Sequence, residues 1–141
     1  MSRSILGAMF ATVFMLGFSG ANAGTADQIA SGREDYFTYC AACHGVGAKG
    51  DGSVAEFLTI ATVDLTQLQK RSAGRFPRER VTLVIDGRIQ VKVHGERDMP
   101  VWGDWFAEEA ATAGVPMTAH EKTVRIRINT LADYLESIQE K

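Results

Sequence analysis

The sequence predicts an all-α protein with a single domain, and three observations support this prediction. Two capping-box patterns, Thr25 with Gln28 and Thr118 with Glu121, mark the expected starts of helices. Apolar residues at steps of four and three follow the second pattern. No segment shows the alternation of apolar and polar residues that is typical of half-buried strands. Helices therefore account for all the regular structure that we expect.

Residues 1–23 have the features of an export signal peptide. Arg3 precedes an apolar stretch from Ile5 to Phe18, and Ala21-Asn22-Ala23 supplies a small-residue cleavage pattern. The stretch is shorter than the ~20 residues that a membrane span needs, although an uncleaved anchor is the alternative. We expect residues 24–141 to form one exported domain in the periplasm, without a membrane span.

The helices of this domain can be assigned in order from their caps and breakers. Thr25 caps a first helix that begins at Ala26 and continues towards residue 40. Four glycines between positions 45 and 53 then predict a loop. Asp64 is placed to cap a short helix over 65–71, and Pro77 suits the first turn of another that ends before Gly87.

The last helix is the longest one that the sequence predicts, with Thr118 as its cap. Its apolar positions recur at steps of four and three, which places them on one face of a helix. This stripe consists of Val124, Ile128, Leu131, Leu135 and Ile138.

The charge distribution argues against nucleic acid as a partner. The chain has 15 basic and 17 acidic side chains, a net charge of −2. Segment 70–97 has 8 basic and 3 acidic residues, whereas 24–69 has 2 and 6, and 98–141 has 4 and 8. A basic middle between acidic ends can steer a charged partner to one face, or it can be an ordinary solvated surface.

The motif Cys40-Ala41-Ala42-Cys43-His44 contains both cysteines of the chain. The pattern C-x-x-C-H is typical of covalent haem attachment, in which two thiols add to the porphyrin and the histidine binds the iron. A disulfide across two residues would restrict the unfolded chain very little. A thioredoxin-like pair would follow a strand, which is not predicted here. A zinc site would need His94 or His120 at unusual spacings.

The second axial ligand of the iron has few candidates. We favour Met99, because Pro100 stiffens the backbone after it and Gly103 is expected to break the chain again, which keeps the thioether on an extended loop. Met117 is interpreted as a packing residue at the start of the last helix. His94 and His120 remain as alternatives, as do lysines. Apolar cover for the porphyrin is expected from Phe37, Trp102, Trp105 and Phe106.

These elements together resemble a monohaem class I cytochrome c over essentially the whole of residues 24–141. The resemblance rests on a helix leading into the segment 40–45, on Met99-Pro100-Val101-Trp102-Gly103, and on a closing helix that contains Leu131-Ala132-Asp133-Tyr134-Leu135. It implies that the first and last helices cross near one covalently bound haem c. It also implies that His44 and Met99 are the two iron ligands.

A haem iron with both axial positions filled by protein predicts an electron carrier and not an enzyme. We expect redox proteins as donor and acceptor, with the chain acting as a monomer or as a subunit of a complex. Two other functions stay open. The chain could be a haem subunit held permanently in a dehydrogenase complex, or Met99 could dissociate and leave a peroxidase or ligand-binding site.

Overall fold

The computed structural model describes residues 25–89 and 99–141, and these residues form helices and turns without a strand. The all-α prediction is therefore confirmed. The predicted signal peptide and His94 lie outside the described residues. The elements in chain order are α1 (Ala26–Tyr39), α2 (Ala41–His44), η1 (Ala55–Phe57), η2 (Leu65–Gln67), α3 (Leu68–Arg71), α4 (Arg78–Ile85), α5 (Trp102–Thr112) and α6 (Met117–Ser137).

Helix α1 begins as the capping box predicts. The Thr25 hydroxyl accepts a hydrogen bond from the Gln28 amide, and the Gln28 side chain accepts one from the Thr25 amide. Asp64 likewise caps η2, because its carboxylate accepts the Thr66 amide at 2.9 Å. Both caps satisfy backbone donors that the first turn of a helix leaves free.

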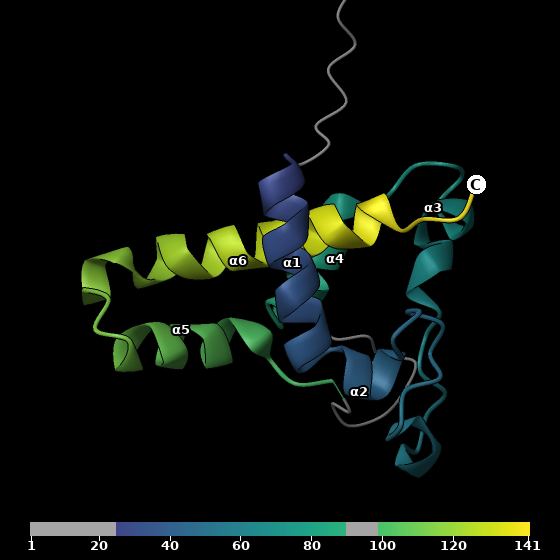
Figure 1. Ribbon diagram of the computed structural model, residues 1–141, viewed down its shortest axis with the longest axis horizontal. Coiled ribbons are helices and arrows are strands. Elements are labelled where there is room, and N and C mark those ends of the chain that lie inside the picture. The colour runs from purple at the N-terminus through teal and green to yellow at the C-terminus, as the bar shows by residue number, and fades with distance from the viewer. Residues whose placement is uncertain (1–24, 90–98) are drawn as a thin grey trace, which may run out of the picture.

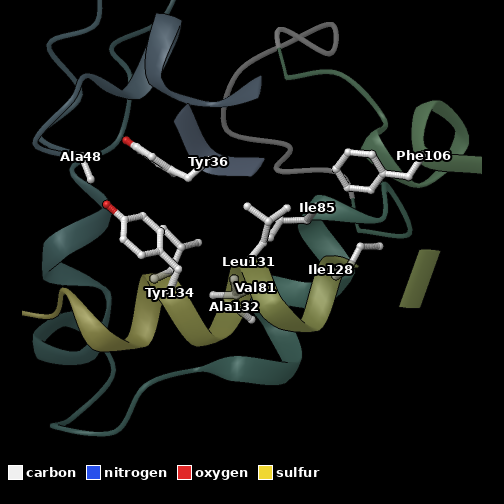
Figure 2. Packing of buried hydrophobic residues seen from close by; sticks show 10 residues of the cluster. Tyr36, Ala48, Val81, Ile85, Phe106, Ile128, Leu131, Ala132 and Tyr134 are labelled. Carbon is white, nitrogen blue, oxygen red and sulfur yellow. The ribbon is translucent and has the colours of Figure 1, made fainter. Parts of the chain in front are cut away.

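Helix α6 is the element around which the others pack. In Figure 1, α1 crosses α6, α5 runs beside it below, and α4 lies behind it. The predicted stripe faces this core, since Ile128, Leu131 and Leu135 are buried. Figure 2 shows side chains of α6 meeting Tyr36 from α1, Ile85 from α4 and Phe106 from α5.

The crossing of α1 over α6 depends on a residue without a side chain. A Cβ atom on Gly32 would lie 1.8 Å from the Thr130 carbonyl oxygen of α6. Only glycine permits the two backbones to approach this closely. The crossing in turn fixes where the end of α1, and hence Cys40, lies relative to the core.

Two predictions about helix boundaries are wrong. Gly103 does not break the chain but is buried in the first turn of α5, where a Cβ would meet the Asp86 carboxylate at 2.2 Å. Helix α6 begins at Met117 after Pro116, so Thr118 lies inside its first turn and makes no cap. Pro116 can precede the helix without a capping side chain, because the rigid ring already restricts the backbone.

Helix α5 could have been found from its own periodicity. Trp102, Phe106 and Ala110 follow one another at steps of four, and Phe106 and Ala110 are buried against α6. Pro100 and Gly103 hid this pattern, because both residues ordinarily indicate a loop.

Arg127 of α6 joins three helices through one guanidinium group. It donates to Asp35 of α1 at 2.7 and 3.1 Å and to Glu109 of α5 at 2.7 Å. Its guanidinium carbon lies 3.9 Å from the centre of the Phe106 ring, and the Tyr39 hydroxyl also donates to Glu109 at 2.8 Å. The planar guanidinium can form this fork and stack on a ring at the same time.

We expect Arg127→Met to lower the free energy of unfolding by about 2 kcal/mol, because two half-buried carboxylates lose their partner. The Arg127 hydrogen bond is the main cause that lowers the pKa of Glu109. Stabilisation by this carboxylate is therefore present above its unfolded pKa and lost as the pH falls through the lowered folded value. Urea unfolding at several pH values should show the largest difference between variant and wild type near neutrality and a smaller one in acid.

Arg125→Met is the matched control, because Arg125 is an exposed arginine on the same helix with one loose ion pair at 3.7 Å. An equal loss in both variants would contradict a specific role for the Arg127 contacts.

Among the described residues, no helix has the length and apolar character that crossing a bilayer requires.

Candidate haem-attachment site

The motif residues Cys40, Cys43 and His44 lie together at the end of α1 and on α2. The backbone turns at Cys40, which ends α1 and precedes α2, and His44 is the last residue of α2. Both thiols are free of disulfide bonds and half-buried. The junction of α1 and α2 therefore brings together two unpaired thiols and an imidazole, the arrangement that attachment of a porphyrin edge requires.

The His44 ring is held by a backbone carbonyl. Its Nδ1 atom lies 3.2 Å from the Val63 carbonyl oxygen, so Nδ1 carries the proton and donates. The Nε2 atom is then the nitrogen with a free lone pair, as in histidines that bind metals. Burial lowers the pKa of His44, against the opposite effect of the Val63 hydrogen bond. The ring is thus kept in the neutral form that a metal ligand needs.

The loop after α2 returns along the motif and is bonded to it at three points. The amides of Gly50, Gly52 and Val54 donate to the carbonyls of His44, Cys43 and Ala42 at 2.8, 3.1 and 3.0 Å. These carbonyls at the end of α2 would otherwise lack partners. The motif is therefore fixed by its own downstream loop, as the glycine-rich composition allows.

Gly45 and Tyr36 secure the start of this loop. Gly45 ends α2 with a φ of 82°, in the region that favours glycine. The fully buried Tyr36 donates its hydroxyl to the Gly45 carbonyl at 2.6 Å, and burial raises the pKa of this phenol, which keeps the donor protonated. Figure 2 shows the hydroxyl end of Tyr36 pointing towards Ala48 of the same loop.

The thiol of Cys40 is unsuited to thiol–disulfide exchange. Burial raises its pKa to about 12, with smaller contributions from Asp35 and Cys43. Redox-active pairs of the thioredoxin type need a lowered thiol pKa, because the thiolate is the nucleophile. This electrostatic environment disfavours the thioredoxin-like interpretation of the motif.

Met99 lies on the segment that leads into α5. It is half-buried and packs against the same core cluster as Cys40 and Ala41. Trp102 also packs against this cluster, and its ring centre lies 5.5 Å from that of Tyr39. Met99 is thus held at the core. His94, the nearest alternative ligand in sequence, lies outside the described residues.

The other residues predicted near the haem divide into two groups. Phe106 is fully buried and Trp102 half-buried in the core cluster. Phe37 and Trp105 are exposed, because they point away from the faces of α1 and α5 that pack on α6. Trp105 instead donates its indole N–H to Glu109 at 2.9 Å.

Met117 and His120 are the two further candidate ligands, and both lie at the start of α6. Met117 is 85 % exposed, so its interpretation as a packing residue is wrong. His120 is half-buried, and its Nε2 atom lies 2.7 Å from the Val115 carbonyl oxygen. One ring nitrogen of His120 is therefore already engaged at the start of α6.

The surroundings of α2 fit a covalently bound haem. The donor set there combines two unpaired thiols and a neutral imidazole, which is the chemistry of c-type attachment. Within the described residues, the hydroxyl oxygen of Thr62 is buried and has no hydrogen-bond partner. A buried hydroxyl of this kind needs a partner, and a polar group of a bound cofactor can supply one.

The end of the chain supports the segment that carries Val63. The Glu140 amide donates to the Thr66 carbonyl at 2.9 Å, and the Gln139 side chain donates to the Leu65 carbonyl at 2.8 Å. The Leu65 amide in turn donates to the Ala48 carbonyl at 2.8 Å. The carbonyl that holds His44 is therefore part of a segment that is fixed directly after Val63, a role that no side-chain pattern could reveal.

Comparison with known proteins identifies the family. Residues 27–115, from α1 to the end of α5, match the family model described as cytochrome C oxidase, cbb3-type, subunit III. No curated protein and no solved structure matches the chain. A cytochrome c domain implies covalently bound haem c and electron transfer with redox partners. The chain belongs to the cbb3-type cytochrome c oxidase subunit III family and contains a c-type cytochrome domain.

Proposed function

We propose that residues 24–141 form a periplasmic one-electron carrier with a single haem c, attached through Cys40 and Cys43. When bound, the haem iron supplies a centre that accepts and gives up one electron. The observation that carries this proposal is the grouping of both thiols and His44 at the junction of α1 and α2, with His44 Nδ1 held by the Val63 carbonyl.

His44 and Met99 are the proposed axial ligands. His44 would bind through Nε2, because its hydrogen bond to Val63 fixes the tautomer and the orientation of the ring. Met99 would bind through its thioether, which favours the reduced iron and raises the reduction potential. Two protein ligands leave no position for a substrate, so these residues support electron transfer in preference to catalysis.

Replacement of Met99 by alanine tests this ligand assignment. We expect the oxidised wild-type protein to show the weak far-red absorption band of a sulfur–iron bond, and the variant to lose it entirely. The reduction potential should fall in the variant, because the thioether no longer stabilises the reduced iron. Optical titration of the purified protein measures both quantities.

Met117→Ala is the control, since Met117 is exposed at the start of α6. A band that survives in Met99→Ala would exclude Met99 as a ligand. Absence of the band from the wild type would favour the alternatives, a histidine-ligated iron or an open site with peroxidase or ligand-binding activity.

Permanent membership of a larger complex is the second candidate function. The description of the matching family names an oxidase subunit, which favours a fixed role over a free carrier. Size-exclusion chromatography of the protein from its native membrane and soluble fractions distinguishes the two. A subunit elutes together with partner chains, whereas a free carrier elutes at the mass of one chain.

A further inference from the structure

We propose that the surface formed by residues 42–57 docks a redox protein whose contact face is basic around an apolar centre. This inference rests on the proposed haem attachment, and it adds the chemistry of the partner. The surface is named here the 42–57 surface. Its exposed members are Ala42, Val46, Gly47, Lys49, Asp51, Ser53, Val54, Glu56 and Phe57.

Three large apolar side chains of the 42–57 surface are exposed to solvent. Val46 is 74 % exposed and Phe57 is 78 % exposed, and Val54 is also exposed. The Val54 amide donates to the Ala42 carbonyl at 3.0 Å, and the Phe57 amide donates to the Val54 carbonyl at 3.1 Å, so the backbone of Val54 and Phe57 is held against α2. Exposed apolar groups with a polar rim are typical of contact sites for other proteins.

The unpaired charges of this surface are negative. Asp51 and Glu56 are exposed, and within the described residues neither carboxylate forms an ion pair. The position of Asp51 is fixed against the motif, since its carboxylate occupies the space that a Cβ on Gly45 would take. The Asp51 charge therefore lies beside the haem-attachment motif, and Glu56 lies on η1 of the same surface.

The one basic side chain of this surface is neutralised. Lys49 forms an ion pair with Glu140, lies 3.8 Å from the Asp64 carboxylate, and donates to the Thr66 hydroxyl at 2.7 Å. Two carboxylates thus surround one ammonium group. A partner that approaches the 42–57 surface meets net negative charge.

The described basic residues of α3 and α4 lie elsewhere. Figure 1 shows α3 near the C-terminus and α4 behind α6, apart from α2 and the loop that follows it at the lower edge of the view. Arg78 of α4 is paired with Asp133 and Glu136 of α6, and Arg88 is paired with Asp86. These arginines therefore do not offset the charge beside the thiols.

A small apolar contact with charge complementarity is what a transient redox encounter needs. Such interfaces are at the low end of the size range, and opposite charges raise the association rate more than the affinity. Electron transfer also requires a close approach to the porphyrin, and Cys40 and Cys43 would hold its edge beside this surface. The partner is therefore expected to present lysine or arginine side chains around apolar ones.

The first test uses a redox-inert cation on the holoprotein. Tris(ethylenediamine)chromium(III) is paramagnetic and broadens the amide NMR signals of residues that it approaches. We expect broadening to concentrate on residues 42–57, whereas the anion hexacyanochromate(III) should leave them sharp. Broadening centred on another face would overturn the proposal without any bearing on haem binding.

The second test measures electron transfer to a cationic, apolar probe. One electron passes from the reduced protein to tris(1,10-phenanthroline)cobalt(III), which leaves oxidised protein and cobalt(II). The double variant Asp51→Asn/Glu56→Gln should react about fivefold more slowly at low ionic strength, and the salt dependence of its rate should be flatter. Phe57→Ser should also slow the reaction while leaving the salt dependence unchanged.

The matched control is Glu108→Gln/Glu121→Gln, which removes two exposed carboxylates near the turn between α5 and α6. An equal effect in this control would mean that net charge alone sets the rate, and would overturn the proposal. The optical spectrum is recorded first for every variant. A chain without a haem spectrum refutes the proposed function, whereas a normal spectrum with unaltered rates refutes only the docking surface.

Discussion

Replacing both Cys40 and Cys43 by serine is expected to abolish covalent attachment of haem. In the wild type, acidified acetone should leave the haem on the protein, because thioether bonds survive the loss of the axial ligands. In the double variant all of the haem should move into the organic phase. A serine hydroxyl has nearly the size of the thiol but forms no thioether, so the change tests the chemistry and not the packing.

Two companion variants make this result interpretable. A variant that keeps only one of the two cysteines should retain haem through one thioether bond. His44→Ala should keep the haem attached but lose the low-spin spectrum of a six-coordinate iron, because the ring held by Val63 is the proposed ligand. Haem that resists extraction in the double variant would contradict the assignment of the motif.

The loss of haem should also weaken the fold. Cys40, Ala41 and Met99 are only half-buried in the polypeptide, although they pack against the core cluster. A bound porphyrin would remove this apolar surface from water, which stabilises the folded state. We therefore expect the double variant to unfold at a lower urea concentration than the wild type.

Gly32→Ala is expected to destabilise the protein by about 3 kcal/mol, a large part of the free energy of unfolding of a domain of this size. The added Cβ would lie 1.8 Å from the Thr130 carbonyl oxygen and 2.4 Å from its carbon. Both atoms belong to the backbone of α6 and cannot rotate away. The two helices must separate, and the contacts of Tyr36 and Leu131 between them are weakened.

Urea unfolding followed by circular dichroism measures this effect. Ser31→Ala is the control, because Ser31 precedes Gly32 on the exposed side of α1 and alanine favours a helix slightly. We expect Ser31→Ala to change the free energy of unfolding by less than about 0.5 kcal/mol. A similarly small change for Gly32→Ala would show that the helices can shift apart at little cost.

The parts of the fold that the sequence predicted correctly are those with local causes. The caps of α1 and η2 act over two or three residues, and the apolar stripe of α6 repeats within one helix. The motif at residues 40–44 is also local, because its chemistry requires residues that are neighbours in the chain. Such features can be recognised without knowledge of any distant contact.

Helix α5 and the start of α6 were mispredicted because local rules conflict with packing there. Gly103 is unfavourable in a helix by itself, but it lies where Asp86 leaves no space for a side chain. The burial of Phe106 and Ala110 against α6 outweighs this local cost. A breaker therefore became part of a helix because of a contact that the sequence does not display.

The sequence by itself determined the family and the all-α class, and it predicts the residues for haem attachment, since these follow from short patterns with a fixed chemical meaning. Only the tertiary structure decided how these residues are supported. The group that holds His44 is the backbone carbonyl of Val63, and every residue has such a carbonyl. Arg127 binds Asp35, which lies 92 positions earlier in the sequence. It also decided that the surface beside the thiols is apolar and acidic, because Lys49 is neutralised by Glu140 from the far end of the chain. Long-range contacts of this kind form only when the helices pack, so no local pattern contains them.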